Sequence, residues 1–229
     1  MISYLLDFFR GDLKAIDLII YILSITYVCL CATPLHEFAH AFVAVKLGDD
    51  TPKLRGRVTI NPMAHIDPLG FLMIFLFGFG YAKPVEVRAR NFKKPKRDMA
   101  IVALAGPLSN FIQAFVYLLI SAIFSVVLII TGIAPLEYIC MFFTFAALIN
   151  IRLGVFNMIP VPPLDGSRLL TAVLPTKVYF KIMQYERYIS IGLMLLLFTG
   201  VLSWPLSIIS EFVYNIFEFI IFLPFNFIG

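Results

Sequence analysis

Long apolar stretches are the feature that most constrains this chain. Of its 229 residues, 61% are hydrophobic and only 14% are charged, and the mean hydropathy is +0.94. Soluble domains are about 45–50% apolar and about 25% charged, so these charges are too few to cover a soluble globule. The sequence therefore predicts a protein that lies in a lipid bilayer. Its net charge of +4 comes from scarce, clustered residues, which argues against a nucleic-acid-binding protein.

Several of the apolar stretches are suited to crossing a membrane as helices. A helical span needs about 20 apolar residues. The first stretch exceeds the thickness of the hydrocarbon core, and we expect a kink at Pro34, because proline removes a helical hydrogen bond. The predicted fold class is an all-α polytopic membrane protein with about four transmembrane helices, at about residues 15–47, 99–130, 136–159 and 188–203.

Two further apolar segments differ from ordinary spans. Residues 206–225 carry Glu211, Asn215 and Glu218 on one helix face, so we expect an interfacial, groove-lining or membrane helix there. Residues 71–82 are too short to cross and contain glycines, so we expect a re-entrant loop or hairpin packed against protein.

The length of the chain limits its domain organisation. At about 20 residues per span, these segments leave no room for another folded domain of ordinary size. We therefore expect one membrane-embedded domain over residues 1–229, with a catalytic core at about 15–170 and C-terminal helices at about 188–226.

The positive charges predict an orientation. Of the 18 Lys and Arg residues, eleven lie within residues 46–97 and four within residues 160–187, whereas the turn at 131–137 has none. Under the positive-inside rule the first two segments are cytosolic and the turn is external.

A short motif inside the first apolar stretch carries the chemistry. His36, Glu37 and His40 form the pattern H-E-x-x-H, which on a helix stacks two imidazoles on one face, ready to share a zinc ion. The plain alternative is a pair of hydrogen-bonded core histidines. Ionisable groups at membrane depth are costly and usually mark function, so the motif favours a zinc site.

A third ligand must come from elsewhere, because a catalytic zinc ion typically has three protein ligands and one open position. Asp165 is favoured because it follows the cytosolic end of the third span, at the depth expected of His36 and His40. An aspartate before a glycine is also typical of a turn or a helix cap. His65 and Asp67 are competing ligands, in a segment that returns to the same side.

Two motifs together resemble a known family. HEFAH at 36–40 and NMIPVPPLDG at 157–166 look like the motifs of the site-2 protease family of intramembrane zinc metalloproteases, and the resemblance covers about residues 20–170. NPMAHIDPLG, GYAKPV and AGPLSN are similar to segments of small bacterial members without extra soluble domains. The chain departs from the family at Ser167, where many members have a second glycine.

The resemblance implies a role for five residues. His36, His40 and Asp165 are implied as ligands of one zinc ion, Glu37 as the general base and Asn157 as a polar group near the scissile carbonyl. The chemistry agrees, since zinc lowers the pKa of bound water to about 7 and a nearby carboxylate can accept the proton. An amide at position 157 is equally typical of helix packing or of a helix cap.

The predicted activity is hydrolysis of peptide bonds in or near transmembrane segments, as in regulated intramembrane proteolysis or the clearance of signal-peptide remnants. The substrate is expected to be a transmembrane protein or peptide, held in extended form against residues 71–82, in a cell membrane crossed several times, with the active site toward the cytosol. A zinc transporter and a catalytically inactive membrane scaffold remain alternatives. The role of His65 and the oligomeric state stay open.

Overall fold

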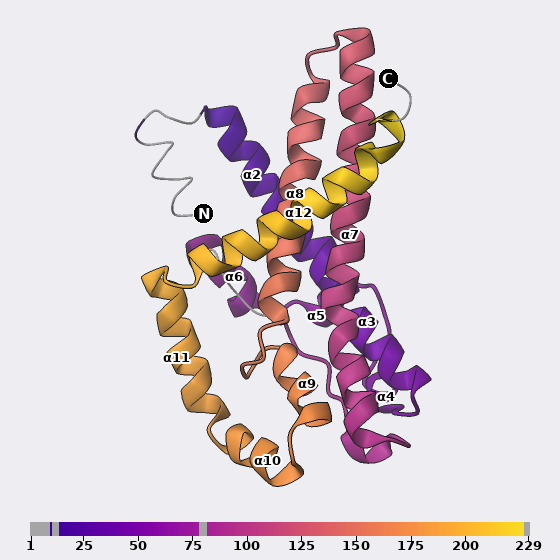
Figure 1. The fold of residues 1–229 in the computed structure, drawn as a ribbon, viewed down its shortest axis with the longest axis vertical. Helices are drawn as coiled ribbons and strands as arrows, with labels where there is room; N and C mark the ends of the chain where they lie inside the picture. The colour runs from indigo at the N-terminus through magenta and orange to yellow at the C-terminus, as the bar shows by residue number, and fades with distance from the viewer. Residues whose placement is uncertain (1–9, 11–13, 78–81, 227–229) are drawn as a thin grey trace.

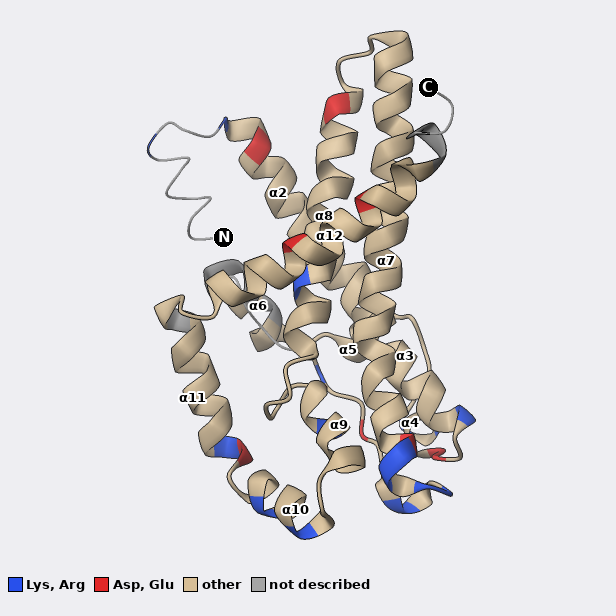
Figure 2. Ribbon diagram, in the orientation of Figure 1, with Lys and Arg blue, Asp and Glu red and all other residues tan. Residues whose placement is uncertain are grey.

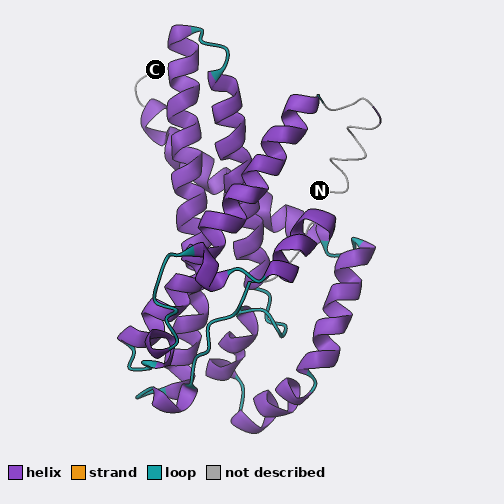
Figure 3. Ribbon diagram, turned by 180° about the vertical axis from the view of Figure 1, so that it is seen from behind, coloured by secondary structure: helices purple, strands orange, loops and turns teal. Residues whose placement is uncertain are grey.

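The structure is a computed structural model that describes residue 10, residues 14–77 and residues 82–226. Every regular element in this part of the chain is helical, and no strand is assigned there (Figure 3). The helices are α2 (Ala15–Tyr27), a π-helical turn (Val28–Ala32), α3 (Thr33–Lys46), α4 (Thr51–Leu54), α5 (Pro62–His65), α6 (Pro68–Phe77), a 3₁₀ turn (Ala89–Asn91), α7 (Pro95–Thr131), α8 (Leu136–Asn157), α9 (Gly166–Val173), α10 (Thr176–Gln184), α11 (Glu186–Thr199) and α12 (Ser203–Asn226).

Four helical segments are long and apolar enough to cross a membrane. They are Ala15–Lys46, Pro95–Thr131, Leu136–Asn157 and Ser203–Leu223. The first combines α2, the π-helical turn and α3. These segments confirm the predicted all-α polytopic class, and the first three match the predicted spans.

The fourth span differs from the prediction. Helix α11 has only 14 residues, about 21 Å at 1.5 Å per residue, and it ends at Gly200, whose φ is 74°. A hydrocarbon core of about 30 Å needs a longer helix, so the predicted span at 188–203 is wrong. Helix α12 is the fourth membrane-length helix, and its polar residues Glu211, Asn215 and Glu218 are exposed.

Small residues let three helices pack closely at the centre of the molecule. Ala32, Ala114, Ala146 and Ala147 have no exposed surface and lie in one core of residues from the first helical segment, α7 and α8. Small side chains allow membrane helices to approach at backbone distance. Helix α12 crosses α7 and α8 obliquely (Figure 1) and adds Ile221 to the same core.

The first helical segment loses α-helical geometry just before Pro34, where the sequence predicted a kink. Residues Val28–Ala32 form a π-helical turn, and the Thr33 hydroxyl donates to the Val28 carbonyl at 3.3 Å. Such turns often occur at functional sites. Here the turn directly precedes the helix that carries H-E-x-x-H.

The predicted re-entrant loop is helical in its first part. Residues Pro68–Phe77 form α6, residues 78–81 lie outside the described part of the chain, and residues 82–88 form neither helix nor strand, with Arg88 in an extended conformation. The Asp67 carboxylate accepts hydrogen bonds from Leu69 N and Gly70 N and so caps α6. The expectation of an extended edge within 71–77 is therefore wrong, and the non-helical backbone lies farther along the chain.

We predict that Ala147→Leu destabilises the helix packing, because overfilling a close-packed core typically costs about 1–3 kcal/mol. A lower midpoint of thermal unfolding in detergent is the expected result. Ala134→Leu is the matched control, because Ala134 is exposed in the turn between α7 and α8. Equal midpoints for the two variants would contradict this account of the core.

Candidate metal centre

The two histidines of the motif lie one helical turn apart on the buried face of α3. Their side chains are only 8% and 7% exposed. The ring centroids of His36 and His40 are 4.7 Å apart, and their Nε2 atoms are 3.1 Å apart. Residues four apart on a helix are neighbours, so the spacing in the sequence brings both Nε2 atoms to one point.

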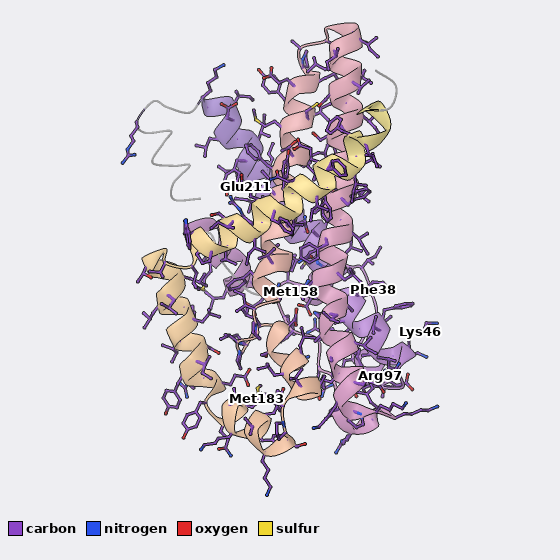
Figure 4. The ribbon with its side chains drawn as sticks, in the orientation of Figure 1. Phe38, Lys46, Arg97, Met158, Met183 and Glu211 are labelled. Atoms are coloured by element: carbon purple, nitrogen blue, oxygen red, sulfur yellow. The ribbon has the colours of Figure 1, made fainter. Side chains whose placement is uncertain are left out.

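Asp165 completes the group from the loop after α8. Its Oδ2 lies 3.1 Å from His36 Nε2 and 3.1 Å from His40 Nε2. Figure 4 shows Phe38, within the motif, and Met158, at the end of α8, at similar heights along the long axis. The structure therefore brings together the three residues that the sequence singled out as ligands. Asp165 is 18% exposed, more than either histidine, so the group is accessible from its side.

The arrangement fits a tetrahedral metal ion. Zinc ligands about 2.0–2.2 Å from the ion at tetrahedral angles are separated by about 3.3 Å, close to the three observed distances of 3.1 Å. Three protein ligands leave one position open. Within the described residues, no other group of three or more His, Cys, Asp or Glu side chains converges in this way.

A backbone carbonyl of α7 fixes the orientation of His40. His40 Nδ1 lies 2.7 Å from Val102 O. A carbonyl oxygen only accepts, so Nδ1 carries the hydrogen and the neutral ring presents the Nε2 lone pair to His36 and Asp165. Metal-binding histidines typically have this second hydrogen bond.

Helix α7 leaves room for the imidazoles at Gly106. A Cβ atom at this position would lie 2.6 Å from both Cε1 and Nε2 of His36 and still closer to His40 Nε2. Real Cβ atoms do not make such contacts. Any side chain at position 106 would occupy the space between the histidines and α7.

A close backbone approach also directs Asp165 toward the site. A Cβ atom on Gly166 would lie 2.5 Å from Ile159 O and would also clash with Met158 O. The loop therefore folds back on the end of α8 only with glycine after the aspartate. Ser167, the departure from the family pattern, is buried and donates to Leu164 O at 2.7 Å, which stabilises the same turn.

Glu37 contacts the non-helical segment of residues 82–88. Its Oε2 accepts a hydrogen bond from Val85 N at 3.2 Å, and its side chain is half-buried. This bond holds residues 82–88 against the helix that carries the histidines.

A second carboxylate, at Asp49, holds the other end of that segment. Asp49 is fully buried, and it accepts from Arg88 N at 2.6 Å, Asn91 Nδ2 at 2.7 Å, and Thr51 Oγ1 at 2.5 Å and N at 3.1 Å. Burial raises the pKa of the Asp49 carboxyl, but the hydrogen bonds from Arg88, Thr51 and Asn91 outweigh burial, and the net shift is downward.

The other candidate residues have different surroundings. His65 is fully buried with Nε2 2.8 Å from Thr59 O, outside the ligand group. Asp67, the remaining competitor for the third ligand, caps α6. Asn157 is the last residue of α8 and is half-buried, and its side chain makes no hydrogen bond to another described residue.

Comparisons with known proteins show the family of the chain. Residues 121–199 match the profile described as "Peptidase family M50". "Putative zinc metalloprotease YwhC" of Bacillus subtilis is 39% identical over 178 residues, which cover 75% of this chain and 80% of that protein. The chain belongs to peptidase family M50. The resemblance to the site-2 proteases is thus confirmed.

Two more relatives are longer than the region they share with this M50 chain. "Zinc metalloprotease MJ0392" of Methanocaldococcus jannaschii is 34% identical over 185 residues, 79% of this chain and 44% of that protein. "Putative zinc metalloprotease Rip2" of Mycolicibacterium smegmatis is 32% identical over 140 residues, 58% of this chain and 50% of that protein. No solved structure matches the chain significantly.

Sequence reasoning missed three contributors to the site of this M50 member: Val102, Gly106 and Val85. Two of them act through backbone atoms, which leave no mark in a motif. Gly106 lies in AGPLSN, a segment that resembles those of family members, yet only the structure shows that its partners are the imidazoles.

We predict that Gly106→Ala lowers zinc affinity at least tenfold, because the new methyl group displaces both imidazoles. Zinc content and chelator competition in detergent measure the effect. Gly192→Ala in α11 is the matched control, since a Cβ there meets nothing within 4 Å. Unchanged zinc affinity in Gly106→Ala would contradict the observed geometry.

We also predict that Asp49→Asn destabilises this M50 member in a pH-dependent way. The folded-state pKa of Asp49 is depressed, so its ionised form stabilises the fold above the unfolded pKa of about 3.9, and that stability is lost as the pH falls through the folded pKa. The variant should unfold at lower temperature than wild type at pH 7, and the difference should shrink below about pH 4. A difference that stays constant with pH would refute the assignment.

Proposed function

We propose that His36, His40 and Asp165 hold the catalytic zinc ion of this intramembrane zinc metalloprotease. The observation that carries the proposal is the convergence of two imidazole nitrogens and one carboxylate oxygen at mutual distances of 3.1 Å, in a chain of family M50. The motif helix and α7 form one wall of the site, and the loop after α8 forms the other.

Glu37 acts as the general base. A bound zinc ion supplies Lewis-acid chemistry, which polarises a carbonyl and acidifies water. Glu37 Oε2 is held by Val85 N at 3.2 Å, so Oε1 takes the proton from the attacking water and later returns it to the leaving nitrogen. The backbone bond to Val85 restricts rotation of the carboxylate and directs Oε1.

Asn157 donates a hydrogen bond to the developing oxyanion. Its amide is half-buried, makes no hydrogen bond to another described residue, and lies at the end of the helix from which the Asp165 loop starts. These facts support a free donor rather than a packing or capping amide. Loss of such a donor typically costs about 10²–10³ in rate.

The active site faces the cytosol. Lys and Arg gather at the lower end of the molecule, around α4, α10 and the start of α7 (Figure 2). In Figure 4 the labelled Lys46 and Arg97 lie below Phe38 and Met158, toward this basic end. The positive-inside rule assigns that end to the cytosol.

The substrate is a transmembrane segment that is cleaved in extended form. A helical peptide bond is shielded by its own hydrogen bonds, so the cleaved residues must unwind. The non-helical residues 82–88, held by Glu37 and Asp49, supply backbone beside the general base with which an unwound strand can pair. We place these functions in one membrane-embedded domain over residues 1–229.

A zinc transporter does not fit as well. A transport path needs ligands or charges repeated along several spans. Among the described residues only one such group converges, formed by His36, His40 and Asp165, and Glu37 directly follows His36 in the sequence.

We predict that Glu37→Gln retains bound zinc and loses cleavage, because the amide cannot accept the proton while the three ligands stay intact. Zinc content is measured on protein purified in detergent, and cleavage on a transmembrane model peptide. His36→Ala is the companion variant, and it should bind zinc far more weakly than wild type and lose activity.

Full cleavage by Glu37→Gln would refute the role of the general base. Wild-type protein that binds zinc, cleaves no transmembrane peptide and moves zinc across liposomes would overturn the protease proposal.

A further inference from the structure

His36 and His40 differ in their second ring nitrogens. His40 Nδ1 bonds to Val102 O at 2.7 Å, whereas His36 Nδ1 is buried and has no hydrogen-bond partner among the described residues. A histidine that binds metal through Nε2 carries a hydrogen on Nδ1, and this N–H almost always has an acceptor that fixes the ring. His36 therefore needs an acceptor.

Asn110 on α7 has the complementary defect. Its side chain is 1% exposed, and its Oδ1 is buried with no partner among the described residues. Buried amide oxygens are rarely left without a hydrogen bond. Asn110 thus has an acceptor without a donor, and His36 has a donor without an acceptor.

The packing of α3 on α7 brings the two residues to the same level. His40 contacts Val102, both histidines face Gly106, and Gln113 Nε2 donates to Ala32 O at 3.4 Å. Residue numbers thus rise along α7 where they fall along the first helical segment, so the two helices pack antiparallel.

This antiparallel register sets His36 between Gly106 and Gln113, where Asn110 lies. Asn110 lies about one turn after Gly106 on α7, offset by about 40° around the helix axis, so the two positions share a face. His36 Cε1, which is bonded to Nδ1, lies against Gly106 on that face. Both orphaned atoms therefore belong to the same buried junction of helices.

We propose that Asn110 is a positioning residue of the metal centre, whose Oδ1 accepts the hydrogen bond of His36 Nδ1–H through one buried water molecule. The inference rests on the proposed function, because it takes His36 as a metal ligand. A buried water with polar partners on both sides satisfies the two atoms together. It holds the His36 ring upright as Val102 O holds the ring of His40.

The structure offers a matched control in Asn150. Its side chain has no exposed surface, and its Oδ1 is likewise buried without a partner among the described residues. Asn150 lies on α8. Gly154 lies against Phe111, and Thr144 bonds to Ser121. Between these two contacts, Asn150 is level with about Ala114, roughly one turn beyond Asn110 on α7.

The test is the zinc affinity of the full chain in detergent, measured by competition with a chelator. Asn110→Leu, which keeps the size and removes the acceptor, should bind zinc about 10–100-fold more weakly. Asn110→Asp, which keeps an acceptor, should bind close to wild type, and Asn150→Leu should equal wild type. The visible spectrum of the cobalt-substituted protein should change in Asn110→Leu alone.

A background without the His36 ligand separates positioning from general packing. In His36→Ala protein, Asn110→Leu should cause no further loss of the remaining affinity. Wild-type affinity in folded Asn110→Leu, or an equal loss in both backgrounds, would overturn the inference while the zinc site itself stood. Equal zinc affinities in wild-type and His36→Ala protein would overturn the inference together with the proposed ligand set.

Discussion

The close approach of α7 to α3 at Gly106 is the contact on which the rest of the site depends. Without a side chain at this position, the two imidazoles lie against the backbone of α7. One turn earlier, Val102 O orients His40. A motif on one helix thus becomes a candidate metal centre because a second helix provides both the space and the acceptor. Close packing in lipid depends on small residues, and here the same requirement shapes the chemistry.

Helix α7 also connects the site to Asp165, the third proposed ligand. It packs against α3, α8 and α9, and Thr171 on α9 donates to Lys96 O near the start of α7. The loop between α8 and α9, which carries Asp165, is therefore held at both ends by helices that pack on α7. The position of the carboxylate follows from this framework together with the close approach of Gly166 to the end of α8.

What the sequence could predict depended on whether the information was local. The spacing of His36 and His40 defines one helix face, so the motif could be recognised from the sequence. The apolar stretches predicted three of the spans, and the Lys and Arg counts assigned their cytosolic ends, which favoured Asp165 as the third ligand. The contacts of Gly106 and Val102 depend on the register of two helices distant in sequence. The fourth span was misassigned because Glu211, Asn215 and Glu218 suggested an interfacial helix, although α12 keeps the length and mean hydropathy of a span.

The two oxygens of Glu37 separate structure from catalysis. Oε2 holds Val85 N, and through it the non-helical residues 82–88, while the proposed proton transfer uses Oε1. A carboxyl group protonated on Oε1 still accepts a hydrogen bond at Oε2. The proposed general base can therefore change its protonation state without releasing the segment beside which the substrate is proposed to lie. Asp49 holds the far end with a carboxyl group whose pKa is lowered, so residues 82–88 stay held at both points throughout the proposed reaction.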